Sequence, residues 1–412
     1  MKNIPLAKPT FSGFECKDLE KVLESGWVTQ GPKVAEFEAK FAEYVGAKHG
    51  VAVSSCTTAL HLSLIVSGVQ SGDVVITVSH SFIATANCIR HCGAEPVFVD
   101  IDPATNNIDI DALERCLRED CEEREGQLWF RQSESFQKTN SPLRFIQKPI
   151  GRVGAILLVH QLGVPCDLDR AMKLSNEFGV PVVEDAACAC GSEFRSSSND
   201  EFERIGRPRA PLACFSFHPR KVITMGDGGI VTTNSEQFAE RIRLLRHHSM
   251  AVSDVERHSS STVIFESYPE TGYNYRLTDI QATIGIRQVE MLPEILKARR
   301  ELAANYHEML SGISWLDTFV VPENIFPNWQ SYVVRINAEA RYSQVEIMQK
   351  LLERGVATRR QCANSHDQPA YNEYSWSLPK SVEATNSGIL LPLFVEMTSD
   401  EQEYVVQTLK EI

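Results

Sequence analysis

The segment ACFSFHPRKVITMGDGG, residues 213–229, places a lysine where it could act as a nucleophile. An apolar strand is predicted to end near Phe217, and Lys221 follows it, shortly before a glycine-rich turn. A lysine held at the end of a buried strand beside a rigid loop can keep its amine neutral and attack a carbonyl carbon. Taken alone the motif is weak, because most lysines after a strand are solvated and GDGG is usually only a turn.

A second apolar strand, within VPVVEDAACACGS (residues 180–192), ends in Glu184 and Asp185. Ligands of open α/β sheets bind at the carboxyl ends of the strands, so a carboxylate there could pair with a cationic atom such as a protonated ring nitrogen. An aspartate before two alanines also fits a helix N-cap, and without further context the cap is the favoured interpretation.

Two further segments offer a phosphate site and an aromatic surface. In VAVSSCTTALHLSL, residues 51–64, a strand leads through Ser55, Cys56 and Thr57 into an apolar helix, whose first N–H groups could bind an anion. Ordinary helix capping explains the same hydroxyl groups about as well. Phe82, in SHSFIATAN, follows another predicted strand, where its ring could cover a planar ligand or pack into the core.

The four segments together supply one set of contacts. Pyridoxal phosphate requires an anchor for its phosphate, a surface that stacks on its ring, a partner for its pyridine nitrogen and an amine that forms an imine. The hydroxyl-rich turn, Phe82, Asp185 and Lys221 provide these contacts in chain order. The sequence therefore predicts a site for pyridoxal phosphate.

Short apolar runs that alternate with helical patterns must position these residues. Helical spacing appears at residues 34–45, and strands are predicted at residues 51–53, 74–78, 96–99, 155–160, 181–184, 212–217 and 230–233. Several of these strands lack period-2 alternation, as expected when helices cover both faces of a sheet. We therefore predict an α/β fold with a mainly parallel sheet.

The pattern of elements changes beyond about Leu292, which divides the chain into two predicted domains. Residues 1–292 form the large ligand-binding domain, and residues 293–412 form a smaller α+β domain with a long charged helix, two short strands and a terminal helix. Residues 118–151 are a polar insertion without sustained periodicity. Connections of this length are uncommon unless they are functional or mobile.

Composition excludes several classes of function. The 412 residues include 54 acidic and 41 basic side chains, a net charge of -13, so no basic footprint for nucleic acid is present. No stretch approaches the roughly 18–20 apolar residues of a membrane-spanning helix, and prolines interrupt the N-terminal segment before a signal core, so we expect a cytoplasmic protein. The 11 cysteines lack zinc-finger spacing, and we expect reduced, mostly buried thiols and no metal site.

The quoted segments, with SGWVTQGPKVAEFE, GAEPVFVDID and GYNYRLTDIQATIGIRQ, resemble the DegT/DnrJ/EryC1/StrS family of sugar aminotransferases. The resemblance extends from about Pro5 to the C-terminal helix, apart from residues 118–151. It implies the fold type I architecture of aspartate aminotransferase and pyridoxal phosphate as cofactor. It also implies transfer of an amino group from an amino acid, expected to be L-glutamate, to a keto group on a nucleotide-linked deoxysugar.

The resemblance also implies the role of each cofactor contact. Lys221 would form the imine and move protons, Asp185 would hold the pyridinium nitrogen, and Phe82 would stack on the ring. The phosphate would be bound by Ser55, Cys56, Thr57 and Ser216, and by Asn274 of a neighbouring subunit, which implies a homodimer with shared sites.

Further matched positions concern the substrate and two departures from the family. Arg359, Arg360 and His366 lie in a segment that would shape the sugar-nucleotide site, although a solvated basic loop is an equal alternative. Cys56 stands where many relatives have glycine, and a backbone N–H contact survives that change. Cys188 stands three residues after Asp185, where many relatives have glutamine or histidine, so a contact to the cofactor ring could be missing or supplied by Gln161.

Two competing functions share the same fold. A PMP-dependent sugar dehydratase of this family would carry histidine in place of the lysine, and a non-catalytic regulator would be expected to have lost Lys221 or Asp185. Both residues are present, which favours the aminotransferase. The nucleotide, the sugar and the choice between C3 and C4 amination do not follow from the sequence.

Overall fold

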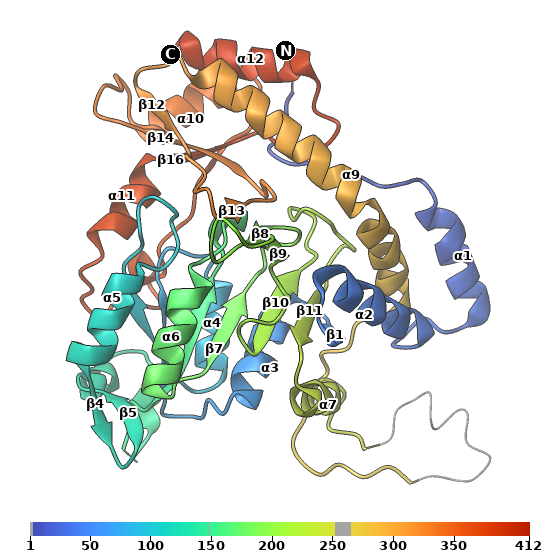
Figure 1. Cartoon of the computed structure of the whole chain (residues 1–412), viewed down its shortest axis with the longest axis vertical. Coiled ribbons are helices and arrows are strands. Elements are labelled where there is room, and N and C mark those ends of the chain that lie inside the picture. The colour runs from blue at the N-terminus through green and yellow to red at the C-terminus, as the bar shows by residue number, and fades with distance from the viewer. Residues whose placement is uncertain (1–2, 148, 252–264) are drawn as a thin grey trace.

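A large lobe built around one seven-stranded sheet carries a smaller lobe at the end of a long helix (Figure 1). The structure is a computed structural model that describes residues 3–147, 149–251 and 265–412. The sheet has the order β1-β11-β10-β7-β6-β2-β3, and only the pairs that involve β11 are antiparallel. The strands are β1 (His49–Val53), β2 (Val74–Val78), β3 (Glu95–Val99), β6 (Val153–Val159), β7 (Val182–Asp185), β10 (Leu212–Ser216) and β11 (Gly229–Thr233). The predicted mainly parallel α/β sheet is confirmed.

Both faces of this sheet are buried, which explains why its strands lack period-2 alternation. In β6, Ala155 and Leu157 join one apolar cluster, whereas Ile156 and Leu158 join another. Helices α3 (Cys56–Val66), α4 (Ala84–His91) and α7 (Glu236–Leu245) cover the first face. Helices α2 (Pro32–Val45), α5 (Ile110–Arg115), α6 (Leu168–Phe178) and the first half of α9 (Asp279–Leu310) cover the second. The sheet is therefore a rigid platform whose strand ends carry the site.

The small lobe contains a four-stranded sheet of order β12-β14-β16-β15, with bounds Leu316–Thr318, Tyr332–Ile336, Gly388–Leu391 and Arg359–Arg360. Helices α10 (Gln344–Glu353), α11 (Pro379–Ser387) and α12 (Ser399–Lys410) accompany it. Its apolar cluster also includes Ile4 from the start of the chain and the C-terminal half of α9. The predicted boundary after Leu292 falls inside α9, which is one helix of 32 residues with Pro293 in its interior. This helix is shared by the two lobes, and the division of the chain into two domains stays a proposal.

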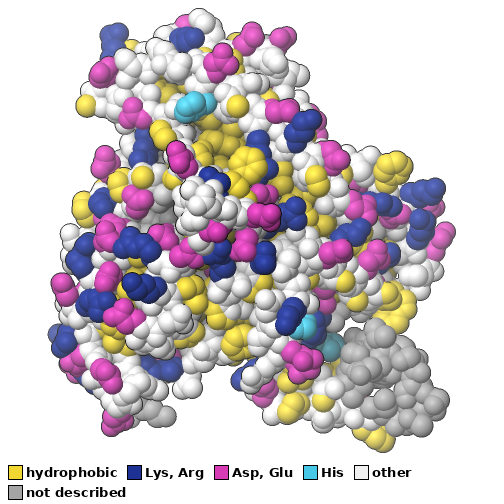
Figure 2. All heavy atoms as spheres, in the orientation of Figure 1, with side chains coloured by type: hydrophobic (Ala, Val, Ile, Leu, Met, Phe, Trp, Pro, Cys, Tyr) yellow, Lys and Arg dark blue, Asp and Glu magenta, His cyan; other side chains and the backbone are white. Residues whose placement is uncertain are grey.

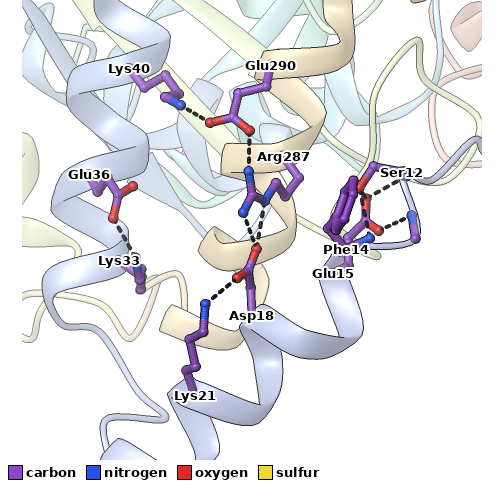
Figure 3. Close-up of polar contacts among 11 residues, drawn as sticks. Ser12, Phe14, Glu15, Asp18, Lys21, Lys33, Glu36, Lys40, Arg287 and Glu290 are labelled. Carbon is purple, nitrogen blue, oxygen red and sulfur yellow. Dashed lines mark hydrogen bonds and ion pairs between the residues drawn. The ribbon is translucent and has the colours of Figure 1, made fainter.

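Charged groups connect helix α1 (Glu15–Ser25) to α9, as Figure 3 shows. Arg287 contacts Asp18 at 2.6 Å and Glu290 at 2.8 Å, and Glu290 also pairs with Lys40 of α2. This chain of ion pairs joins three helices, although each pair is partly exposed and contributes modestly to stability.

The insertion at residues 118–151 contains regular structure that sequence periodicity did not predict. A π-helical turn, η1 (Cys116–Asp120), leads into a hairpin of β4 (Cys121–Arg124) and β5 (Gln127–Phe130), followed by 3-10 turns η2 (Ser133–Lys138) and η3 (Pro142–Phe145). Phe136 is buried and packs against Tyr374 and Trp376, with ring centroids 5.0 and 6.3 Å away. Aromatic contacts to a segment distant in sequence therefore order the insertion.

Charges of both signs are mixed over the face of the molecule that Figure 2 shows, in agreement with the absence of a basic footprint in the sequence. Across the described ranges, no helix combines the length and apolar character needed to cross a membrane. All 11 cysteines are free and seven are buried, which confirms the prediction for the thiols. The remaining elements are β8 (Glu193–Phe194), β9 (Glu203–Arg204), β13 (Ile325–Phe326), η4 (Gln161–Gly163) and η5 (Ser365–Asp367).

Candidate active site

The candidate site lies where the carboxyl ends of β6, β7 and β10 meet the start of α3. Because neighbouring parallel strands end at the same edge of a sheet, this topology brings together residues that are far apart in the sequence. Cys56 at the start of α3 lies with its sulfur 4.0 Å from Oδ1 of Asp185, the last residue of β7. Lys221 follows β10 in the same region.

Asp185 is a buried carboxylate with few hydrogen-bond donors. Thr85 donates to its Oδ2 at 2.8 Å and the Ala187 N–H donates to its Oδ1 at 3.2 Å. Burial raises the pKa of Asp185, and these two donors and the charge of Lys221 only partly oppose that effect. The residues directly after Asp185 form a turn and no helix begins there, so the helix-cap interpretation is wrong. The carboxylate is instead suited to a cationic ligand atom that would complete its solvation.

Lys221 is half-buried and its amine points at a thiol. Its Nζ donates to Sγ of Cys188 at 3.0 Å, and its N–H donates to the carbonyl of His218 at 2.8 Å. Burial works against the ammonium form, but the sulfur of Cys188 and the carboxylate of Asp185 outweigh it, and the net effect raises the pKa of Lys221. The lysine is therefore not a solvated surface residue, and its charge is compensated inside the site.

The start of α3 provides the expected anion site. Ser55 is the N-cap, and its side chain accepts from the N–H of Thr58 at 3.2 Å. The first N–H groups of a helix have no acceptor within the helix, so those of Cys56 and Thr57 can bind an anion. Ser216 adds a hydroxyl at the end of β10. Capping and anion binding are compatible here, since different groups serve each purpose.

Phe82 stands free of the core. Its side chain is 66% exposed, which excludes the core-packing alternative. One helical turn further on, Thr85 is buried and bonds to Asp185. Sequence reasoning missed Thr85, although a hydroxyl three residues after the candidate ring-stacking residue was an available signal.

Gln161 and His366 both contact the segment that follows β2. Gln161 is buried, and its side-chain amide donates to the main-chain carbonyl of His80 at 2.6 Å. His366 lies with Nδ1 2.6 Å from Oγ of Ser79, and its own N–H donates to that hydroxyl at 3.0 Å. The solvated-loop alternative is therefore wrong for His366, whereas Arg359 and Arg360 are exposed on β15.

Asn274 is exposed on the segment that precedes α9. This segment forms an isolated bridge with His247 next to α7, and Arg276 contacts the ring of His247. An exposed asparagine at this position is available to another subunit. Its predicted contact to the neighbouring cofactor stays a prediction.

The residues present fit pyridoxal phosphate. Asp185 is nine-tenths or more buried with its pKa raised, as expected of a carboxylate that awaits a pyridinium nitrogen. An amine, an exposed aromatic ring and a helix N-terminus supply the other contacts that the cofactor requires.

Comparisons with known proteins agree with this arrangement. The sequence pattern of the DegT/DnrJ/EryC1/StrS aminotransferase family matches residues 10–410. The aminotransferase TlmJ from Streptoalloteichus hindustanus is 30% identical with a TM-score of 0.82, covering 99% of this chain and 98% of that one. Sugar aminotransferase CalS13 from Micromonospora echinospora is 26% identical with a TM-score of 0.79 and 99% coverage of both chains. Spr1654 from Streptococcus pneumoniae, in its PMP form, is 25% identical with a TM-score of 0.83, covering 99% and 98%. The expected fold type I architecture is confirmed.

Proposed function

The chain belongs to the DegT/DnrJ/EryC1/StrS aminotransferase family, and we propose that it transfers an amino group from L-glutamate to the keto carbon of a nucleotide-linked deoxysugar. It is a pyridoxal phosphate-dependent sugar aminotransferase. The glutamate donor, the nucleotide-linked acceptor and the roles of individual residues belong to our proposal.

The observation that carries the proposal is the amine of Lys221, held 3.0 Å from Cys188 and within the electrostatic influence of Asp185. Amino transfer needs a base that removes a proton from one carbon and returns it to another. A dehydratase of this fold would have histidine at position 221 and could not regenerate a lysine-bound resting state. A regulator has no need for a buried and only partly compensated carboxylate such as Asp185.

Each residue of the site then has a distinct task. When bound, pyridoxal phosphate supplies an aldehyde that accepts the amino group and a ring that withdraws electrons. Lys221 holds and moves the proton at Nζ, and Asp185 keeps a positive charge on the atom that it faces. Phe82 excludes water from one side, and the turn from Ser55 to Thr57, with Ser216, anchors a phosphate.

The proposal also assigns residues to the substrate. We assign Gln161, Arg359, Arg360 and His366 to the sugar-nucleotide site, where guanidinium groups would pair with phosphate oxygens. The exposed position of Asn274 supports a homodimer in which each subunit completes the other's phosphate site. A cytoplasmic location is also part of the proposal.

Turnover with defined substrates tests the proposal. The enzyme is incubated with L-glutamate and a panel of dTDP-, UDP- and GDP-linked 3- or 4-keto-6-deoxysugars. We expect 2-oxoglutarate and an aminosugar nucleotide in equal amounts. A deoxygenated sugar with release of ammonia would instead identify a dehydratase. Absence of turnover across the panel, despite cofactor bound to Lys221, would identify a regulator.

A further inference from the structure

A short segment of the small lobe, residues 328–330 between β13 and β14, contacts the loops that carry the site. Asn328 is fully buried, and its side-chain amide donates to the carbonyls of Cys188 at 2.8 Å and Cys190 at 2.9 Å. Its N–H donates to Oγ of Ser192 at 3.1 Å, and that hydroxyl donates to the carbonyl of Gly163 at 2.6 Å. One asparagine thus joins the loops that follow β6 and β7.

Gln330 extends the same connection to the loop after β10. Its N–H donates to Oδ1 of Asn328 at 2.8 Å, and its side-chain amide donates to the carbonyl of Arg220. Arg220 directly precedes Lys221. The carbonyls that this segment holds therefore belong to Cys188 itself and to the residue next to Lys221.

The segment is itself held rigidly. Arg299 of α9 is buried and donates to the carbonyls of Trp329 at 2.9 Å and Gln330 at 2.8 Å. Burial lowers the pKa of Arg299 to about 10, so its guanidinium remains charged at neutral pH. Trp329 has a φ of 52°, in the left-handed region that is costly for a bulky side chain and persists only where surrounding contacts enforce it.

The space at Gly163 also shows that the contact with Asn328 is specific. Gly163 has a φ of 89°, and a Cβ atom there would overlap the amide of Asn328. The loop after β6 therefore admits Asn328 only because residue 163 is glycine. The contact is specific, since both the hydrogen bonds and the free space match one side chain.

We propose that Asn328 and Gln330 are positioning residues that hold the thiol of Cys188 against the amine of Lys221. The two carbonyl anchors lie at Cys188 and directly before Lys221, so they set the 3.0 Å separation between Sγ and Nζ. The sulfur then accepts a hydrogen bond from the lysine and fixes the direction of its amine. This inference rests on the proposed function, because it assigns Lys221 to the chemistry.

The test uses the pH at which the apoprotein captures pyridoxal phosphate. Only the neutral amine attacks an aldehyde, so the midpoint of the capture rate against pH follows the protonation of Lys221. Capture is measured by borohydride reduction and peptide mass spectrometry. Because the sulfur of Cys188 favours the ammonium form, Cys188→Ala lowers this midpoint, by about one pH unit if the sulfur acts as a close charge partner.

Variants of Asn328 and Gln330 should lower the midpoint of the capture rate, as Cys188→Ala does. In Asn328→Leu an uncharged side chain of similar size replaces the amide that donates to two carbonyls, and in Gln330→Met the donor to Arg220 is lost; neither change opens a cavity or adds a charge beside Lys221. Each should lower the midpoint by at least half of the Cys188→Ala shift. Combining Asn328→Leu with Cys188→Ala should lower it no further than Cys188→Ala alone, because the two changes break one contact.

Asn337→Leu provides a matched control. Asn337 follows β14 and donates to the carbonyl of Ser314 at 2.8 Å and to Asp317 at 3.1 Å, so the same chemical change occurs outside the site. Its midpoint should equal that of wild type. A wild-type midpoint in both Asn328→Leu and Gln330→Met, or a double variant whose shift is the sum of the two single shifts, would overturn the inference. Failure of wild-type apoprotein to capture the cofactor on Lys221 would refute the proposed function instead.

Discussion

Replacing Asp185 by asparagine should have opposite effects on the apoprotein and on catalysis. Asparagine keeps the shape of the side chain, and its single Oδ1 can still accept from the Ala187 N–H, which lies 3.2 Å from Oδ1 of the carboxylate. Its Nδ2 would replace the oxygen that accepts from Thr85 at 2.8 Å and can donate to that hydroxyl instead. The substitution therefore removes the negative charge and reverses one hydrogen bond. Since burial raises the pKa of Asp185, the apoprotein bears a free-energy cost for the ionised form that Asp185→Asn abolishes.

The expected loss of activity in Asp185→Asn follows from removal of the proposed ion pair between the Asp185 carboxylate and the pyridinium nitrogen of the cofactor. Removing one partner of a buried charge pair costs about 3–5 kcal/mol, which at about 1.4 kcal/mol for each factor of ten is a roughly 100- to 4,000-fold loss in kcat/KM. Thr85→Val, which removes one hydrogen bond to a charged acceptor, should lose less, roughly 10- to 100-fold.

The raised pKa of Asp185 also determines how the stability of the apoprotein changes with pH. A raised pKa in the folded state means that Asp185 favours folding below its unfolded pKa of about 3.9 and that this contribution is lost as the pH rises through the folded value. The stability of apo Asp185→Asn relative to wild type should therefore increase across that interval and stay constant above it.

Thermal unfolding of both apoproteins and steady-state kinetics with glutamate are the assays. The apo melting temperature of Asp185→Asn should equal or exceed that of wild type, while its kcat/KM falls by the factor above. A melting temperature many degrees lower, or kinetics close to wild type, would refute the assignment of Asp185 to a cationic ring atom and show a structural role.

Two other predictions concern the lysine and the subunit contact. The rate at which wild-type apoprotein captures pyridoxal phosphate should rise with pH through the neutral range, because the pKa of Lys221 is raised and its ammonium form must lose a proton; a rate independent of pH would contradict this. Mixing inactive Lys221→Ala with inactive Asn274→Ala chains should restore activity, since one site of the hybrid dimer has both native residues. No recovery despite proven subunit exchange would exclude a role for Asn274 across the interface.

The central sheet and the position of the candidate site residues at its edge could be predicted because local sequence encodes them. Continuous apolar runs identified all seven strands to within two residues, since helices on both faces remove the need for alternation. The strand-end rule then placed Asp185 and Lys221 at one edge of the sheet. The helix-cap alternative for Asp185 was wrong because the chain turns at Ala186 instead of entering a helix.

Other features depend on contacts between distant residues and leave no local pattern. The insertion packs through Phe136, which lies in η2 after the hairpin, against Tyr374 and Trp376, more than 200 residues later. Asn328 lies 140 residues from Cys188, and a polar residue before a strand carries no signal of that contact. Gln161, a candidate partner for the cofactor ring, instead donates to the carbonyl of His80, a choice that only packing decides.

The central claim, that Lys221 carries the cofactor, is tested most directly by mapping the site of borohydride fixation. Purified holoenzyme is reduced with borohydride, digested and analysed by peptide mass spectrometry. The pyridoxyl group is predicted on Lys221, in the peptide that follows β10, with loss of the visible absorption of the bound cofactor. A label on Lys173 or another lysine, with Lys221 unmodified, would contradict the account.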